Sequence, residues 1–392
     1  MLDVSGIRQV HTERFGKEPV VFMAPGRVNL IGEHTDYADG FVMPAAIDFA
    51  TIAAISPSDD RSGTVFSKNF GAAVHRALDE IGTHGSHHWS DYPFGVVSIL
   101  QQEGISVPGF HLTLDGDVPL GAGLSSSASI EVASMLAMLH IADATLPLPK
   151  IALLCQRAEN DYVGAPCGIM DQFVSCCGAA DHALLLDCRS LDYRLAPIPK
   201  HLSLVICNTM VKHSHAGGEY GSRRAEVEEG TAILRRHRSE IRLLRDATLE
   251  DLKRWGHEMP PDVLKRCRHI ITENSRTVAA ADALEANDLP TLGRLMAEAH
   301  ASYRDDFEAS CREADIFVEL ANRLDGCVGA RLTGGGFGGC TVNLVESAHA
   351  EQFAAKIAAG YEELTGIHPE IYQSHASAGA HKLEQYAQLL PN

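Results

Sequence analysis

A short stretch of small residues is the first place where residue type and spacing suggest chemistry. Residues 119–133 read PLGAGLSSSASIEVA, between a strand-like segment and an apolar helical pattern. Small residues let several backbone N–H groups converge on one ligand, and a helix N-terminus adds unpaired donors with a positive partial charge. Such a bend suits a phosphate, and hydroxyl groups can add hydrogen bonds or a magnesium contact. A serine-capped helix after a glycine turn explains the same letters without a ligand.

This stretch matches neither of the two common phosphate-binding motifs. The pattern Gly-x-x-x-x-Gly-Lys-Ser and its lysine are absent. Gly121-Ala122-Gly123 is not followed by a glycine at position 126, which the dinucleotide fingerprint requires. A phosphate site here would therefore be built in another way.

Charged side chains crowd the turn-rich segment PGRVNLIGEHTDYADG, residues 25–40. Glu33 and Asp36 lie close to His34, and ionised carboxylates accept strong hydrogen bonds from the hydroxyl groups of a sugar. Arg27 carries five donors in a fixed fork, which suits a phosphoryl group. A solvent-exposed acidic turn is the alternative interpretation.

An acidic residue among apolar neighbours marks PCGIMDQFVSCCG, residues 166–178. A carboxylate in such surroundings needs a partner or a task. If Asp171 faces Arg27 across a cleft, it stays ionised and can take a hydroxyl proton. Capping of a helix that starts at Gln172 accounts for the sequence equally well.

A fourth feature is LTGGGFGGCTVNLV, residues 332–345, where five glycines surround Phe337. These glycines allow a close backbone approach to another group. A plain hairpin turn is the competing explanation.

The intervening sequence predicts the elements that must position these residues. Strands are expected within 19–33, 41–57 (split by a turn), 109–121, 202–209, 329–345 (two strands around the glycines) and 369–377 (the closing strand). Helices are expected over 129–144, 149–164, 221–247 and 349–366. A shorter helix is expected to start at 249 and to end before Pro260, and another to start at 262. Helical sequence is also expected on both sides of a break at 288–290. In the first helix, Ile130, Ala133, Leu136, Ala137 and His140 fall at helical spacing. Strands and helices mix in both halves, which predicts an α+β protein of two domains, residues 1–200 and 201–392.

Composition restricts the classes of partner. The chain has 392 residues and a formal net charge of −18, which disfavours nucleic acids and anionic membranes. The basic clusters at 235–238 and 264–269 alternate with acidic residues and indicate solvated helix faces. Neither a leader peptide nor an apolar run of about 18 residues is seen, so we expect a cytoplasmic protein.

The cysteine and histidine spacings do not favour a metal centre. None of the ten cysteines forms a Cys-x-x-Cys pair, so buried free thiols are expected. The histidine-rich segment 83–89 is better explained as a polar loop than as a metal site.

Taken together and in order, these motifs resemble those of the galactokinases and of the wider GHMP kinase superfamily. Residues 26–37 resemble the galactokinase signature, 119–129 the superfamily's ATP-binding motif, and 332–345 its C-terminal glycine motif. Residues 158–173 and 212–224 also resemble galactokinases. The resemblance extends from about Phe15 to the last predicted strand. It implies a ribosomal protein S5 domain 2-like N-terminal domain facing a ferredoxin-like C-terminal domain across the active-site cleft.

The same resemblance implies an activity and its substrates. The expected reaction is phosphorylation of α-D-galactose at its anomeric hydroxyl by Mg²⁺ and ATP, which gives galactose 1-phosphate and ADP at the entry to the Leloir pathway. Galactose and ATP are the expected partners, without nucleic acid or membrane, and the chain is expected to be a monomer or a weak oligomer.

Site residues follow from the resemblance position by position. Asp171 corresponds to the catalytic carboxylate, as base or orienter, and Arg27 to the arginine that stabilises the transferring charge. The implied sugar ligands are Glu33, His34, Asp36, Gly168, Asp171 and Tyr220. The implied nucleotide contacts are Gly121, Ala122, Gly123, Leu124, Ser125, Ser126, Ser127, Lys212, Gly335 and Gly336. Ser127 and Glu159 match the magnesium pair. Trp89 is our own hypothesis for a wall of the adenine pocket, because an aromatic face suits a base.

Alternative functions remain open from sequence alone. A kinase of the same fold can act on another sugar, such as N-acetylgalactosamine, arabinose or galacturonate. A silenced galactokinase can serve as a galactose sensor, but such relatives can lack residues of the serine motif. Here SSSAS is intact and Asp171 is present, which favours an enzyme.

Overall fold

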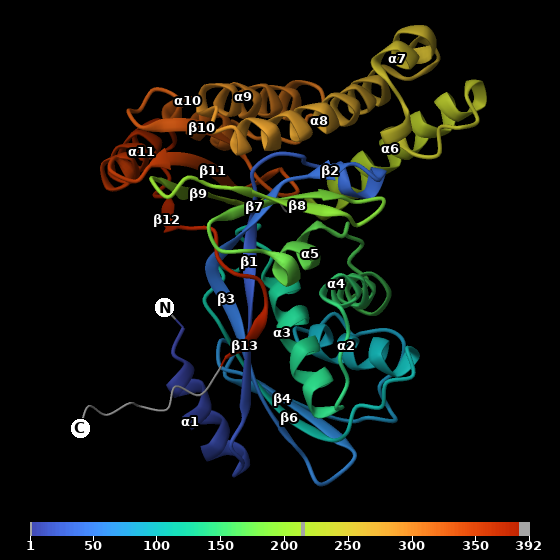
Figure 1. The fold of residues 1–392 in the computed structure, drawn as a ribbon, viewed down its shortest axis with the longest axis vertical. Helices are drawn as coiled ribbons and strands as arrows, with labels where there is room; N and C mark the ends of the chain where they lie inside the picture. The colour runs from blue at the N-terminus through green and yellow to red at the C-terminus, as the bar shows by residue number, and fades with distance from the viewer. Residues whose placement is uncertain (1, 213–215, 384–392) are drawn as a thin grey trace.

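A computed structural model describes residues 2–212 and 216–383, and the statements below concern these residues. Figure 1 shows an elongated molecule in which a lower and an upper body of mixed helix and sheet are stacked along the long axis. The expected α+β class is confirmed. Within the described ranges, none of the helices is long and apolar enough to cross a membrane.

The lower body is built on a six-stranded sheet. In spatial order its strands are β13 (His381–Leu383), β1 (Val20–Asn29), β3 (Pro44–Pro57), β6 (Phe110–Gly116), β4 (Ser62–Ser67) and β5 (Ala72–Ala77). Neighbouring strands are antiparallel except β4 and β6, which are parallel. The pairing of β1 with β3 shifts register between Pro25 and Arg27. This irregularity directly follows Pro25, which has no N–H to donate to the sheet.

Helices cover both faces of this sheet. They are α1 (Val4–Phe15) on one face, and α2 (Asp91–Gln102), α3 (Ser126–Ile141), α4 (Leu148–Arg157) and α5 (Met170–Cys177) on the other (Figure 1). The longest of them, α3, packs against β1 and β3, and it is buried around much of its circumference. His140, which we placed on its apolar stripe, is exposed.

The upper body holds a four-stranded antiparallel sheet. Its strands are β10 (Cys327–Leu332), β11 (Gly338–Glu346), β9 (Leu202–Lys212) and β12 (Glu370–Ser374). Its helices are α6 (Ala216–His237), α7 (Leu249–Trp255), α8 (Pro261–Glu285), α9 (Leu289–Asp305), α10 (Arg312–Ala321) and α11 (Ala350–Thr365). A smaller sheet of β2 (Phe41–Val42), β7 (His182–Asp187) and β8 (Tyr193–Pro197) lies between the two bodies (Figure 1).

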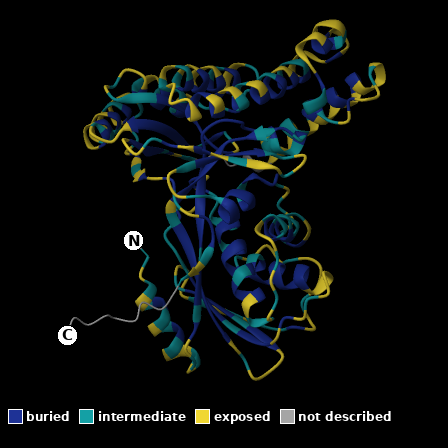
Figure 2. Ribbon diagram, in the orientation of Figure 1, coloured by how far each residue is buried: buried dark blue, intermediate teal, exposed yellow. Residues whose placement is uncertain are grey.

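Alternation along β9 explains why the two bodies are joined by a core. Val205 and Cys207 pack in one cluster with α10 and α11. Leu204 and Ile206 belong to another cluster, which also contains Val28 and other residues of the lower body. Figure 2 shows this buried layer running from one body into the other. The cleft residues are therefore carried on elements that pack together as one unit.

Several predicted boundaries differ from the structure. The apolar segment 41–57 contains one long strand, β3, preceded by the short β2. The charged helix predicted to end at Ala247 ends at His237. The chain turns back after this residue, and Nε of Arg235 donates to the carbonyl of Ile241. The strand predicted to close the chain is followed by β13, which pairs with β1 in the lower sheet.

Candidate active site

Two clefts contain most of the residues singled out from the sequence. The first is lined by Arg27, Glu33, His34, Asp36, Glu159, Gly168, Asp171, Tyr220 and Gly335, together with intervening residues. The second is lined in part by Trp89, Ser126 and Ser127. Ser127 in the second cleft interacts with Glu159 in the first, so the two clefts adjoin at these residues.

Arg27 and Asp171 form a bidentate pair in the first cleft. Nε and Nη2 of Arg27 donate to Oδ1 and Oδ2 of Asp171 at 2.8 and 2.7 Å. Nη1 of the same guanidinium donates to the carbonyl of Gly123 at 2.6 Å. The pairing that the sequence suggested is present, and it joins the end of β1 to the first turn of α5 and to the glycine-rich bend.

The backbone around Arg27 explains the glycine before it. The N–H of Arg27 donates to the carbonyl of Leu124 at 3.1 Å. A Cβ on Gly26 would lie 2.6 Å from that same oxygen, closer than real Cβ contacts. Only glycine lets the strand approach the bend this closely.

Asp171 receives one more hydrogen bond from the bend. Ser125 donates its hydroxyl to Oδ2, so this oxygen accepts from two groups. Among the described residues, Oδ1 accepts only from Arg27, which leaves it one lone pair. That lone pair is available to a hydroxyl group in the cleft.

Glu33 is held by backbone and side-chain donors on both oxygens. Asn29 donates to Oε2, and the N–H of Gly334 donates to Oε1 at 2.9 Å. Only 1% of Glu33 is exposed, and burial raises the pKa of its carboxyl to about 6 although Arg331 opposes the shift. This carboxylate therefore connects the turn after β1 to the glycine hairpin of the upper body.

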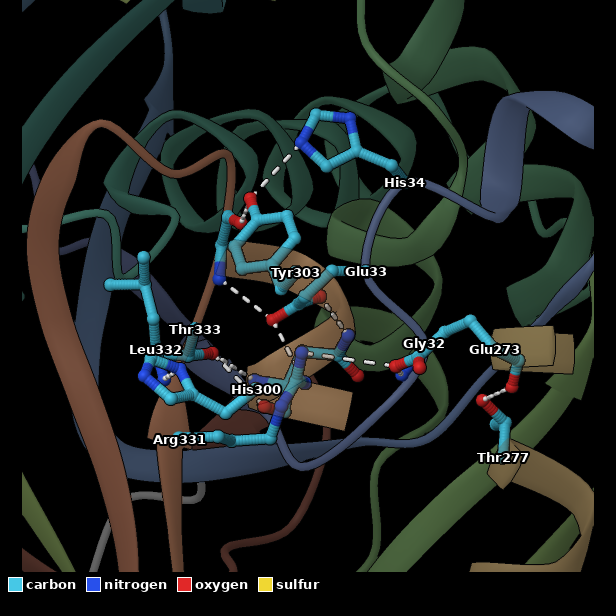
Figure 3. Close-up of polar contacts among 12 residues, drawn as sticks. Gly32, Glu33, His34, Glu273, Thr277, His300, Tyr303, Arg331, Leu332 and Thr333 are labelled. Atoms are coloured by element: carbon cyan, nitrogen blue, oxygen red, sulfur yellow. Dashed lines mark hydrogen bonds and ion pairs between the residues drawn. The ribbon is translucent and has the colours of Figure 1, made fainter. Parts of the chain in front are cut away.

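His34 has a tautomer that its neighbours fix. Nε2 faces the carbonyl of Gly335 at 3.2 Å and the hydroxyl of Tyr303 at 3.1 Å, and that hydroxyl donates to the carbonyl of Gly334. Nε2 must therefore carry the proton, and Nδ1 accepts from Tyr37 at 3.0 Å. Burial lowers the pKa of His34 to about 3, so the ring is neutral. Figure 3 shows the ring with its contact to Tyr303.

Asp36 and Gly168 are in direct contact in the lining of the first cleft. A Cβ on Gly168 would come within 1.6 Å of Oδ2 of Asp36, so no other residue fits at position 168 without displacing this carboxylate. Burial raises the pKa of Asp36 to about 6, and the negative charge of Asp171 adds to the shift. The pair places a desolvated carboxylate within the same cleft as Asp171.

Tyr220 enters the cleft from α6. Its ring packs 5.1 Å from His34 and 6.1 Å from Tyr37, measured between centroids. Arg223, one turn further along the helix, donates to the carbonyls of Phe307 and Glu308 and so fixes α6 against the upper body. The side chain of Lys212 lies outside the described part of the chain, so its predicted role is left as a prediction.

The serine-rich bend precedes α3, as the sequence indicated. Gly121 and Gly123 have φ of +71° and +77°, and Ser125 adopts the left-handed conformation just before the helix starts at Ser126. The three serines point to different partners: Ser125 to Asp171, Ser127 to Glu159, and Ser126 into the second cleft. The bend thus offers the helix N-terminus to the space between the two clefts. Ala122 and Leu124 are buried, which leaves their backbone for the predicted nucleotide contact.

The glycine hairpin between β10 and β11 approaches both the bend and the first cleft. A Cβ on Gly334 would lie 3.4 Å from the carbonyl of Gly123, and one on Gly335 would lie 3.6 Å from the Tyr220 ring. At Gly336, where φ is +86°, a Cβ would meet the carbonyl of Ala309 at 2.4 Å. Gly335 and Gly336 therefore lie on the side of His34 and Tyr220, and their predicted nucleotide contact stays a prediction.

Two buried residues next to Glu159 were not identified from the sequence. Nε2 of Gln172 donates to Glu159 at 2.6 Å and to Glu131 at 3.1 Å. Burial and the negative charge of Glu159 raise the pKa of Glu131 well above its usual value. The only sequence signal was a glutamate inside an otherwise apolar helix, because both partners come from other elements.

The cluster around Glu159 is rich in acids and poor in cations. Burial, followed by the charge of Asp171, raises the pKa of Glu159 to about 7. Mg²⁺ typically takes one or two protein oxygens and completes its shell with phosphates and water. Across residues 2–212 and 216–383, no group of three or more His, Cys, Asp or Glu is arranged to hold a metal by itself. A desolvated acidic site beside a phosphate-sized bend fits a cation that arrives with a nucleotide.

The second cleft has an aromatic wall. Trp89 stacks on Phe70 with ring centroids 5.6 Å apart, and Tyr92 lies nearby along the lining. Ser126 and Ser127 form its end towards Glu159. An aromatic face of this kind suits a planar base.

Sequence profiles of three described families match the chain. The galactokinase galactose-binding signature matches residues 9–57, the N-terminal domain of GHMP kinases matches 91–179, and their C-terminal domain matches 280–363. The matches include the segments that carry Arg27, Glu159 and the glycine hairpin.

Known proteins are similar over almost the whole chain. A galactokinase of Chloroflexus aggregans is 47% identical over 93% of this chain and 94% of its own. The crystal structure of Lactococcus lactis galactokinase complexed with galactose superposes with a TM-score of 0.92 at 34% identity, covering 97% of this chain and all of the other. The mevalonate kinase of Methanococcus jannaschii, at 18% identity and a TM-score of 0.63, shares the fold.

Proposed function

The chain belongs to the galactokinase family, and on this premise we propose the roles that its residues take in the reaction. It has the two-domain GHMP kinase fold and catalyses the ATP-dependent phosphorylation of galactose. The observation that carries our assignment of roles is the bidentate pair of Arg27 and Asp171, both of which line the first cleft. We retain the division into residues 1–200 and 201–392 as a proposal.

In the proposed reaction, galactose occupies the first cleft with its anomeric hydroxyl at Asp171. Oδ1 accepts the hydroxyl hydrogen bond and either takes the proton or orients the oxygen for attack on the γ-phosphorus of ATP. The new O–P bond gives galactose 1-phosphate, and ADP leaves with the β–γ bridging oxygen. Arg27 stabilises the charge that spreads over the transferring group. Glu33, Asp36, Gly168 and Tyr220 line the cleft around the other hydroxyls.

His34 contributes shape instead of a polar contact. Both ring nitrogens already bond to the protein, so the neutral ring supports Tyr37 and the Gly335 carbonyl at the wall of the cleft. We propose that His34 fixes this wall and that hydroxyl recognition falls to the carboxylates.

ATP is proposed to span both clefts. Its adenine lies against Trp89, and its phosphates lie at the bend of residues 121–127, where the N-terminus of α3 favours negative charge. Ser127 and Glu159 would hold Mg²⁺, which neutralises phosphate charge when bound. Gln172, whose amide also donates to Glu131, fixes the Glu159 carboxylate from behind.

One experiment tests the proposed position of transfer. The protein is incubated with Mg·ATP and galactose, and the phosphorylated carbon is identified by NMR, with N-acetylgalactosamine, arabinose and galacturonate in parallel ADP-release assays. Phosphate on the anomeric carbon, with galactose as the preferred sugar, supports the proposal. Phosphate on another carbon, or preference for another sugar, overturns it.

A further inference from the structure

Arg331 is a charged side chain that makes no hydrogen bond to any other described residue. It lies on β10, two residues before the glycine hairpin, and its side chain is 0% exposed. None of its three guanidinium nitrogens has a hydrogen-bond partner within residues 2–212 and 216–383. A buried charge in this state costs several kcal/mol of desolvation, so the residue needs a compensating role.

Two carboxylates flank this guanidinium. Nη1 lies 3.3 Å from Oε1 of Glu33, and Nη2 lies 3.8 Å from Oε1 of Glu273 on α8. Figure 3 shows Arg331 reaching towards both. Glu273 is bound in turn by Arg276, whose Nε donates to it at 2.8 Å. Charges of alternating sign thus run from α8 to the wall of the first cleft and sum to zero.

The same residues fix the backbone on both sides of Glu33. The N–H of Gly32 donates to Oε1 of Glu273 at 2.9 Å. Thr333, two positions after Arg331, accepts from the N–H of Asn29 at 2.8 Å and donates to its carbonyl at 3.0 Å. The turn that carries Glu33 is therefore held by β10 and α8 of the upper body.

We propose that Arg331 is a positioning residue that holds the Glu33 carboxylate in its ionised, hydroxyl-accepting form at the wall of the first cleft. The inference rests on the proposed role of Glu33 towards galactose. It assigns the charge on Arg331 to substrate recognition, because a folding role alone is served as well by an apolar residue of similar volume.

The electrostatics around Glu33 agree with this role. Burial raises the pKa of Glu33 to about 6, and Arg331 is the largest influence that opposes the rise. The other charged or titratable groups that face it are Arg27 from β1, His269 and Glu273 from α8, and Tyr303 from α9. Loss of Arg331 removes the nearest cation and lets the pKa of Glu33 rise further.

The test compares R331M, R331K and E33Q with the double variant E33Q/R331M. In R331M we expect the KM for galactose to rise at least about tenfold while the KM for ATP stays within about threefold, since a charged hydrogen-bond partner is impaired only at the sugar. The acid limb of kcat/KM for galactose should move to higher pH by about one unit, because a protonated Glu33 loses the charge-assisted hydrogen bond to the sugar hydroxyl. R331K, which restores the charge, should return both quantities towards the wild-type values.

The double variant separates positioning from folding. If Arg331 acts through Glu33, R331M adds no further loss and no further pH shift in the E33Q background. Because E33Q/R331M removes both charges of the pair, it keeps the test available if R331M alone does not fold. R238M is the matched control, since it breaks an ion pair with the buried Asp251 near the end of α6. It should lower the melting temperature without moving the acid limb.

Three results would overturn the inference. They are a destabilised R331M with unchanged galactose KM and pH profile, losses that add fully in the double variant, and an E33Q variant with normal galactose kinetics. The wild-type protein is assayed in parallel. If it phosphorylates galactose, these outcomes count against the role of Arg331 and not against the proposed function.

Discussion

Arg27 and Asp171 are 144 positions apart and are joined by two parallel hydrogen bonds of 2.8 and 2.7 Å. The third contact of Arg27, to the carbonyl of Gly123, ties this pair to the phosphate-sized bend. The Asp171 carboxylate and the backbone of the glycine-rich bend are therefore held at a fixed separation by one guanidinium. Phosphoryl transfer requires mainly such positioning and charge stabilisation.

Replacing Asp171 by Asn should abolish most turnover while leaving nucleotide binding intact. Asparagine retains the shape, but its amide group opposes the donors of Arg27 and cannot take a proton. We expect kcat to fall by about 10²–10⁴ in a coupled ADP-release assay, the range typical of a lost general base. Calorimetric titration with ATP should give an unchanged Kd. D161N, whose carboxyl is 61% exposed, is the control. Turnover of D171N near the wild-type rate would remove Asp171 from the reaction.

Gly168→Ala should weaken galactose binding selectively. The new Cβ would come within 1.6 Å of Oδ2 of Asp36, so this carboxylate must leave its position. Loss of one hydrogen bond to a charged group corresponds to about 10- to 100-fold in the galactose KM, with the ATP KM unchanged. Gly82→Ala, which would meet no atom within 4 Å, should behave as wild type. An unaltered galactose KM in G168A would show that Asp36 does not bind the sugar.

Local motifs in the sequence predicted the components of the site but not their connections. The glycine-rich bend, the acidic turn and Asp171 each stand in a short recognisable segment, although helix α3 starts at Ser126, three residues before its predicted start. The contacts that complete the site are between distant segments. Arg331 meets Glu33 and Glu273, and no local pattern indicates which acids will neutralise a buried arginine.

Element boundaries failed where tertiary contacts override local propensity. The helix predicted over 149–164 is α-helical only to Arg157 and continues as a π-helical turn, Ala158–Val163, which carries the buried Glu159. Strand β13 pairs through only three residues with β1, near the other end of the chain. Periodicity over a short window contains neither kind of information.

Acid should destabilise the protein partly through His11. This residue is buried on α1, and its ring bonds Thr113 and Ser56 at 2.9 Å each. Burial, with a smaller effect of His111, lowers the pKa of His11 to about 4 from 6.5. The pKa of His11 is lower in the folded than in the unfolded state. The stability that the neutral ring contributes is therefore complete above pH 6.5 and is lost as the pH falls towards 4.

The shift in the pKa of His11 from 6.5 to about 4 corresponds to roughly 3 kcal/mol of unfolding free energy. Urea unfolding at pH 7 and pH 4 should show a smaller acid loss in H11Q than in the wild type, because a neutral amide has no proton to gain. Other buried histidines, such as His34 and His269, contribute to the pH dependence of stability equally in both proteins. Equal acid losses in the two proteins would contradict the assignment.

The two tryptophans of the chain allow the second cleft to be tested directly. Trp89 lines that cleft, whereas Trp255 stacks on His237 at the far end of α6. If adenine packs against Trp89, ATP should change the fluorescence of W255F, and the change should be absent in W89F. W89A should raise the KM for ATP about tenfold, since stacking of a base on an aromatic ring is worth about 1–3 kcal/mol. The galactose KM should stay constant in the same variant. A nucleotide-dependent signal that survives in W89F and disappears in W255F would place the base elsewhere.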